Sequence, residues 1–189
     1  MNNQQLVAFL KKNLACRPAL EWLQARTLAE AWEQSERGDW LLWLAAKAGV
    51  DRRRLVMAAC ACARLALVHV PPGEERPRVA IETAEAWCRG EATIEQVKEA
   101  RRNAADAYAA YASSPAYAAA AYAAAAAAAA AAYASSPASS PAAAAYAAYA
   151  AADAADAAAD SRALKEAAEL VRGLISCAEV EAAINGRAI

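Results

Sequence analysis

An alanine-rich tract constrains this 189-residue chain more than any other feature. Residues 104–160 contain 37 Ala among 57 residues, and all seven Tyr of the protein lie within them. Alanine has the highest helix propensity, so the tract predicts folded helices rather than a disordered linker. Because alanine has little bulk, neighbouring helices can approach closely, and the tyrosine rings must supply most of the buried area.

Prolines divide this tract into segments. Ser-Ser-Pro-Ala repeats precede two of its alanine runs, and tyrosines recur at an eleven-residue spacing. Proline disrupts a helix interior but suits the first turn of a helix after a serine cap. We therefore predict one continuous helix over 116–134 with Pro115 in its first turn, and another that begins near Pro137 or Pro141. The repeat is either functional or a product of codon slippage.

Acidic residues follow the tyrosines at helical spacing. Tyr146, Tyr149, Asp153, Asp156 and Asp160 are separated by steps of three and four, which places them on one stripe of a helix. The aspartates either face inward, toward arginines of the first half, or face solvent. Both alternatives stay open.

Helix signals punctuate the first half of the chain. Two threonines begin capping boxes, and an aspartate can cap a third helix. Two prolines can occupy the first turns of helices, and glycines can end helices. The residues are Thr27, Thr93, Pro18, Pro77, Asp51, Gly49 and Gly90, and we further expect Gly38 to end one helix and Asp39 to cap the next. No segment shows convincing β-alternation.

Two apolar segments are predicted to be the centre of the fold. Every residue of 40–46 is apolar, and only Arg64 interrupts 55–68. A helix that is apolar on all sides must be surrounded by others. We therefore predict burial of five of their residues, which are Trp40, Trp43, Leu55, Cys62 and Leu65.

These signals predict an all-α fold, a compact multi-helix bundle with long Ala-rich antiparallel helices in the second half. We expect a single domain over 1–189. It would combine a helical cluster over 1–103, which holds all five Trp, with a helical hairpin and C-terminal helix over 104–189.

The charge and the cysteine content of the chain limit which molecules it can bind and in which cell compartment it can act. Residues 1–103 have a net charge of +3 and residues 104–189 of −4, which suits two docking halves, and the overall charge of −1 argues against a nucleic-acid surface. The alanine tract lacks the large apolar residues that drive membrane insertion.

Five cysteines without a signal peptide indicate free thiols in the cytoplasm. Abundant Ala and an excess of Arg over Lys suit a bacterial or phage genome.

The sequence offers little material for catalysis, and we predict no metal or cofactor. His69 is the single histidine, Cys60 and Cys62 diverge on a helix, and no phosphate-binding glycine motif occurs. The densest polar cluster comprises Arg64, His69, Glu74, Glu75, Arg76, Glu82 and Glu85. These residues form either a solvated face with ion pairs such as Glu85 with Arg89, or an acid–base site. Arg37, Asp39 and Trp40 are the other candidate binding residues.

Three segments carry a resemblance to a known family. They are TLAEAWEQSERGDWLLWL (27–44), RLVMAACACARLALVHVPPGEERPRVAIETAEAWCRGEAT (54–93) and the trailing Ala/Tyr-rich helices. With their RGDW, P-x-G-E-x-R-P and AIE-x-AEAW elements, they resemble a bacterial family likened to immunity family five, which accompanies polymorphic toxins. The resemblance covers about 16–175. It implies an all-α protein that binds and neutralises a toxin, and it carries over no binding motif.

Three classes of function therefore stand beside one another. The leading hypothesis is a non-enzymatic, cytoplasmic protein that binds a toxin or other protein effector and contacts neither nucleic acid nor membrane. The second is an enzyme or small-ligand binder that uses Arg64, His69, Glu82 and Glu85. The third is an Ala-rich helical surface protein of the ice-binding kind. The sequence leaves the oligomeric state open.

Overall fold

The computed structural model describes residues 1–23, 25–110, 120, 124–125, 127–129, 131 and 161–186. Every regular element among them is helical, which confirms the all-α prediction. The seven alanines described between 120 and 131 are helical, in agreement with the helix expected over 116–134. Pro115 and the aspartates of 153–160 lie outside the described residues.

The helices have the following bounds, in chain order. They are α1 (Asn3–Lys12), α2 (Arg17–Trp22), α3 (Leu28–Gln34), α4 (Gly38–Ala48), α5 (Arg52–Leu65), the 3₁₀ helix η1 (Ala66–His69), α6 (Arg76–Arg89), α7 (Ile94–Ala110), α10 (Ser161–Leu174) and α11 (Cys177–Gly186).

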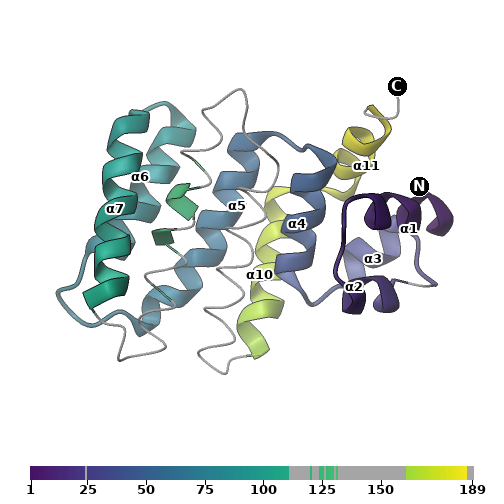
Figure 1. Ribbon diagram of the computed structural model, residues 1–189, viewed down its shortest axis with the longest axis horizontal. Coiled ribbons are helices and arrows are strands. Elements are labelled where there is room, and N and C mark those ends of the chain that lie inside the picture. Colours follow the sequence, from purple (N-terminus) through teal and green to yellow (C-terminus); the bar gives the residue numbers. More distant parts are fainter. Residues whose placement is uncertain are drawn as a thin grey trace.

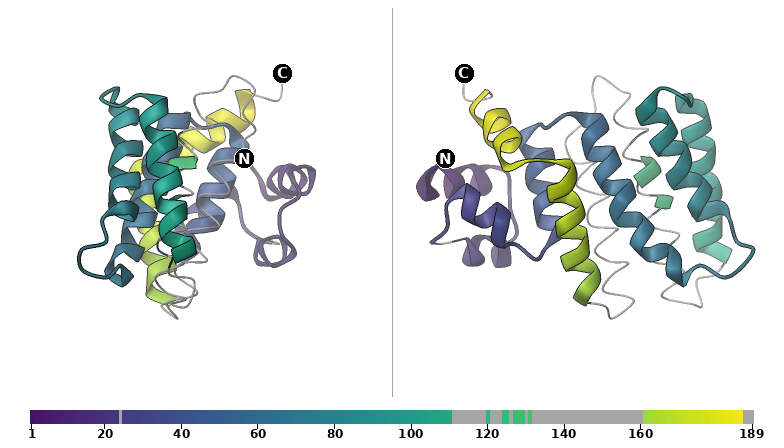
Figure 2. Two further views of the ribbon diagram at one scale, coloured as in Figure 1. Left: turned by 60° about the vertical axis from the view of Figure 1, so that its left-hand side comes forward. Right: turned by 180° about the vertical axis from the view of Figure 1, so that it is seen from behind.

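The described helices pack side by side along the long axis of the molecule (Figure 1). The α6–α7 hairpin lies at one end and packs on α5, and the short helices α1 to α3 lie at the other end. Helix α10, from near the C-terminus, packs against both α4 and α5, as the rear view in Figure 2 shows. A helix from the second half thus completes the core of the first half.

Most of the predicted helix boundaries are confirmed. Thr27 forms a capping box with Glu30, and the Asp51 side chain accepts a hydrogen bond from the Arg54 amide. Gly49 and Gly90 follow the last residues of α4 and α6 with φ angles of 90° and 81°, in the left-handed region that favours glycine. These signals act within four residues along the chain, and tertiary packing does not override them.

Two local predictions are wrong. Gly38 begins α4 instead of ending the helix before it, and Asp39 is a buried residue of the first turn rather than a cap. The apolar run 55–68 is not one α-helix, because α5 ends at Leu65 and Val68 beyond it is 80% exposed. The chain changes to a 3₁₀ turn there, which swings Val68 away from the core.

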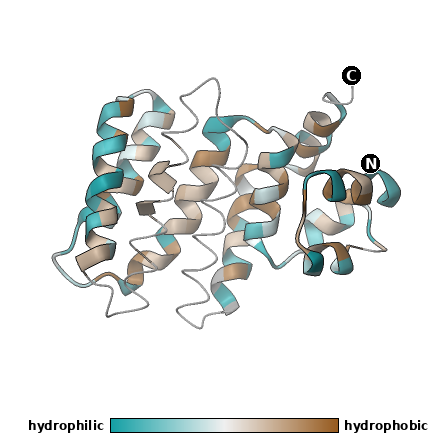
Figure 3. Ribbon diagram, in the orientation of Figure 1, coloured by the Kyte–Doolittle hydropathy of each residue, from teal (hydrophilic) through white to brown (hydrophobic). Residues whose placement is uncertain are grey.

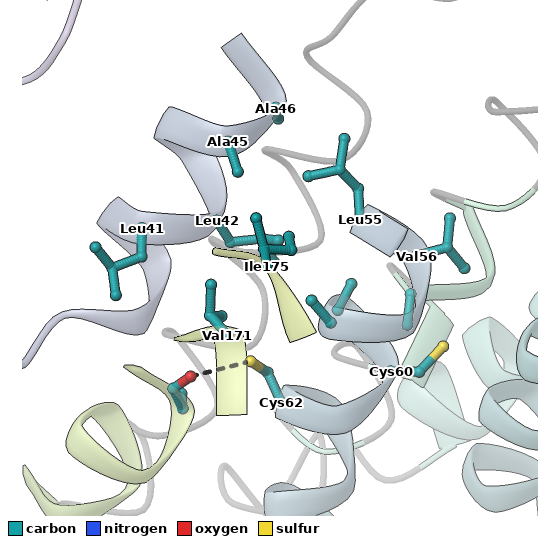
Figure 4. Packing of buried hydrophobic residues seen from close by; sticks show 14 of the residues in the cluster. Leu41, Leu42, Ala45, Ala46, Leu55, Val56, Cys60, Cys62, Val171 and Ile175 are labelled. Carbon is teal, nitrogen blue, oxygen red and sulfur yellow. Dashed lines mark hydrogen bonds between the residues drawn. The ribbon is translucent and has the colours of Figure 1, made fainter. Parts of the chain in front are cut away.

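The core lies between α4, α5 and α10 (Figure 4). Leu42 of α4, Val56 of α5 and Ile175 just after α10 are fully buried within it. Figure 3 shows α5 coloured as largely hydrophobic, whereas α7 carries hydrophilic residues along much of its length. This pattern agrees with a central α5 and a peripheral α7.

The predicted core list is right for two of its five residues. Leu55 and Cys62 are buried, whereas Trp40, Trp43 and Leu65 are only partly buried. The deeply buried tryptophan is instead Trp32 of α3, at 1% exposure. Five residues of the apolar run are buried, and the two tryptophans are the ones that α4 leaves partly exposed. The buried residues are Leu41, Leu42, Leu44, Ala45 and Ala46.

Within the described part of the chain, no helix is both long enough and apolar enough to cross a membrane.

Candidate functional site

The structure places the predicted site residues in three separate groups. Arg37, Asp39 and Trp40 lie where the chain enters α4. Arg64 and Glu85 join α5 to α6. The remaining residues, His69, Glu74, Glu75, Arg76 and Glu82, lie along the connection from η1 to the first turns of α6. The expected single polar cluster is therefore divided.

The group at the start of α4 is held by an ion pair. Arg37 donates from Nε to Oδ1 of Asp39 over 2.9 Å and from Nη2 to Oδ2 over 2.8 Å. The Asp39 side chain is only 3% exposed, so its charge needs this partner. The Arg37 guanidinium also lies 5.0 Å from the centre of the Trp40 ring. Arg37 thus links a buried carboxylate to a partly exposed aromatic ring.

Trp40 belongs to a larger assembly that the sequence did not indicate. Its ring meets Trp22 of α2 edge-on, with centroids 6.0 Å apart, and Arg26 lies 4.3 Å above the Trp22 ring. We call Arg26, Trp22, Trp40 and Arg37 the arginine–tryptophan stack. The adjoining apolar cavity measures about 40 Å³, which is space for little more than one water molecule. The stack joins α2 to α4.

The carboxylates of α6 are held by arginines in a pattern other than the expected one. Glu85, whose side chain is 15% exposed, accepts from Arg64 Nε over 2.8 Å and from Nη2 over 2.6 Å. The hydrogen bond to Glu85 raises the pKa of Arg64, with the Glu85 charge as a further cause. The expected Glu85–Arg89 pair is not formed, because Arg89 bonds to Glu91 over 2.7 Å. The bidentate bond between α5 and α6 therefore replaces a pair within one helix.

Further ion pairs order the start of α6. Glu74 accepts from the Arg76 amide over 3.0 Å and from Arg76 Nε over 2.8 Å. Arg78 bridges Glu75 and Glu82, with distances of 2.6 and 2.8 Å from its Nε and Nη1. Glu82 is thus directed to Arg78 and not to Arg64. His69, at the end of η1, is half-buried.

A groove between α5 and α10 is the main feature that sequence reasoning missed. It has a volume of about 680 Å³ and opens to solvent. Its floor is apolar and comes from both helices, and charged residues form its rim. The lining residues are Met57, Ala61, Leu65, Leu170, Gly173 and Leu174, with Arg64, Glu85, Glu166 and Glu169 at the rim. No local pattern could reveal it, because its two walls lie more than 100 residues apart.

Four charged side chains of α10 divide between the end of α3 and the groove. Arg172 donates to the carbonyl oxygens of Trp32 and Ser35 over 3.2 and 2.9 Å, and Lys165 bonds to Glu36 over 2.9 Å. Glu166 and Glu169 are exposed and form no ion pair or hydrogen bond with the described part of the chain. They form an acidic edge on the groove. The pKa of Lys165 is raised by its hydrogen bond to Glu36 and, as a lesser cause, by the Glu169 charge, so Glu169 is compensated only at a distance.

The described cysteines are all free thiols, as predicted. The Sγ of Cys60 lies 3.9 Å from the Ile81 carbonyl and that of Cys62 3.9 Å from the Ala167 carbonyl, so the two point to different neighbours (Figure 4). Burial raises the pKa of Cys62 to about 12, with the Asp39 charge as a lesser cause. Among the described residues, no cluster of His, Cys, Asp and Glu could hold a metal ion.

Comparison with known proteins gives one match. A family model described as "Imm-5 like putative immunity protein" matches residues 48–176. No curated protein and no solved structure matches the chain. Every residue that lines the groove lies inside the matched segment, whereas the arginine–tryptophan stack lies before it.

Proposed function

The chain belongs to the Imm-5-like family of immunity proteins, and we propose that it binds and inhibits a protein toxin without chemical turnover. Inhibition by binding requires a rigid scaffold and a complementary surface of roughly 800 Å² on each partner. The helical core supplies the scaffold. The free thiols further support action in a reducing compartment, and we place the protein in the bacterial cytoplasm.

The groove between α5 and α10 is the observation that carries this proposal. It combines an apolar floor with a charged rim, which is the make-up of a protein-binding surface. It also lies within the segment that the family model matches. A partner that fills the groove would bury Leu170 and Leu174, the second of which is 37% exposed.

The enzyme alternative has less support from the geometry. It needs Arg64, His69, Glu82 and Glu85 to converge on one pocket. The groove contains Arg64 and Glu85, but both oxygens of Glu85 accept hydrogen bonds from Arg64. Glu82 is directed to Arg78 and His69 lies outside the lining. This arrangement favours a structural role for the arginine–glutamate pairs.

The ice-binding alternative needs a flat, exposed alanine face. Six of the seven alanines described between 120 and 131 are buried, and they belong to the main core. They favour a packing role for the alanine tract, in which short side chains allow close helix approach.

Co-expression with the toxin domain encoded by a neighbouring gene tests this function. We expect a complex that survives purification and toxin activity that is lost on binding. The control is the toxin domain with an unrelated helical protein of similar size. Full toxin activity in the presence of excess protein would refute the proposal.

A further inference from the structure

We propose that the groove between α5 and α10 receives a basic amphipathic helix of the partner protein. This inference rests on the proposed function and specifies the surface and the chemistry that it uses. Three features of the groove support it, namely the spacing of its apolar residues, the sign of the rim charges that form no direct ion pair among the described residues, and the empty space at one glycine.

The apolar floor has the geometry of a helix-binding groove. On α5, Met57, Ala61 and Leu65 follow one another at four-residue intervals. On α10, Leu170 and Leu174 do the same. Two such ridges on neighbouring helices leave a channel into which the apolar face of a third helix packs.

The length of the groove fixes the size of the docked segment. The lining residues span 57–65 on α5 and 166–174 on α10. Each stretch covers about 12 Å at 1.5 Å per residue, or roughly two helical turns. A partner helix of three or four turns would therefore fill the groove and extend past both ends.

The rim determines the charge of the occupant. Arg64 and Glu85 neutralise each other through their bidentate bond. Glu166 and Glu169 remain, and they are one turn apart on the same side of α10. Lysine or arginine side chains beside the apolar face of the partner helix would compensate these two charges.

Gly173 leaves the groove open at its α10 wall. A Cβ placed on Gly173 would meet no atom within 4 Å. A side chain can therefore begin there without a clash. Because Gly173 lines the groove, a large side chain would occupy the space that the partner helix needs. Gly186, at the end of α11, has equally open surroundings and lies outside the groove lining, so it provides a matched control.

The test uses a defined probe in place of the unidentified partner. The probe is a 14-residue amphipathic helix of leucine and lysine, compared with the same helix in which glutamate replaces lysine. Isothermal titration calorimetry measures the affinity of each peptide for the wild-type chain and its variants. We expect saturable 1:1 binding of the leucine–lysine peptide and at least tenfold weaker binding of the leucine–glutamate peptide.

Substitutions then locate the binding site. Gly173→Phe and the double variant Glu166→Lys, Glu169→Lys should each weaken the leucine–lysine peptide at least tenfold. Gly186→Phe should not, and neither should Glu95→Lys with Glu99→Lys, which make the same charge change on exposed residues of α7. Circular dichroism melting verifies that every variant is folded. Absent binding, or equal weakening by the controls, would overturn the proposal.

The toxin assay separates this inference from the proposed function. If the wild-type chain neutralises the toxin and Gly173→Phe neutralises it equally well, the groove assignment is wrong and the immunity function stands. If the wild-type chain does not neutralise the toxin, the proposed function fails. The peptide titration alone then decides whether the groove binds a basic amphipathic helix. Light scattering tests whether a second copy of the chain occupies the groove. A dimer of the wild-type chain that Gly173→Phe dissociates would overturn the proposal.

Discussion

Gly38 at the start of α4 lies directly against Ala167 of α10. A Cβ built on Gly38 would come within 2.6 Å of both the carbonyl carbon and the Cβ of Ala167. The absence of a side chain at residue 38 therefore sets how closely α10 approaches α4. This contact joins the first half of the chain to the second, and it explains why a glycine stands at the first position of α4.

Replacing Gly38 with alanine should destabilise the fold. The added methyl group meets backbone atoms that cannot rotate away, so we expect Gly38→Ala to reduce the free energy of unfolding by about 1–3 kcal/mol. Gly173→Ala, in the open part of α10, should instead raise it by about 0.5–1 kcal/mol through helix propensity. Urea unfolding measures both. Equal effects at the two glycines would contradict the close contact.

Ile81 in the core should contribute more to the stability of the fold than Leu65 in the groove. Ile81 is fully buried, so Ile81→Ala should cost about 2–5 kcal/mol. Leu65 lines the groove and is only partly buried, and Leu65→Ala should cost about 1 kcal/mol. If Leu65 were buried, as the sequence predicted, Leu65→Ala would instead cost as much as Ile81→Ala. Urea unfolding of the two variants therefore tests the position of α5.

Arg172 should stabilise the end of α3. Its guanidinium donates to the carbonyl oxygens of Trp32 and Ser35. These oxygens lie at the C-terminal end of α3, where the helix has no further amide groups to donate to them. Arg172→Met keeps the apolar stem and removes both bonds, so we expect a loss of about 1–3 kcal/mol in unfolding free energy. Lys165→Met is the matched change on the same helix as Arg172. It removes only an exposed ion pair with Glu36, so it should leave the free energy of unfolding nearly unchanged.

The buried thiol of Cys62 should make the fold sensitive to alkaline pH. Its pKa is about 12 in the folded protein against an ordinary 9.0. Between these values the thiol ionises only in the unfolded chain, so unfolding becomes easier as the pH rises, by up to about 1.4 kcal/mol per pH unit. Below pH 9 both states are protonated and the effect vanishes.

Urea unfolding from pH 8 to pH 11 under reducing conditions measures this dependence. Cys62→Ala should make the alkaline decline shallower. The rest of the decline comes from thiols such as Cys60, whose pKa burial also raises. Cys16→Ala, at an exposed thiol, should leave the decline unchanged. An unaltered slope in Cys62→Ala would show that this thiol is not held neutral by burial.

Local signals explain which parts of the fold could be predicted from the sequence. The capping box of Thr27 and the left-handed glycines act over a single turn, and they are confirmed. The contact of Gly38 with Ala167 spans 129 positions, and nothing near Gly38 distinguishes it from a helix-ending glycine. The apolar run likewise continues past Leu65 to Val68, so it gives no sign of the change to a 3₁₀ helix at Ala66.

The candidate site was less predictable for the same reason. Glu85 was expected to pair with Arg89 one turn away, but Arg64 of the neighbouring helix offers a bidentate bond to a largely buried carboxylate. Trp22 and Trp40 meet only because α2 packs against α4. The groove requires α5 and α10 to be adjacent, which no pattern within either helix states.

Titration of toxin activity against this protein tests the central claim most directly. A binding inhibitor must be present in at least equal amount, so the account predicts that toxin activity falls linearly and reaches its minimum at a 1:1 molar ratio. An enzyme that modifies the toxin would act at a small fraction of that amount. Complete loss of toxin activity at a ratio far below 1:1, or no loss at any ratio, would contradict inhibition by binding.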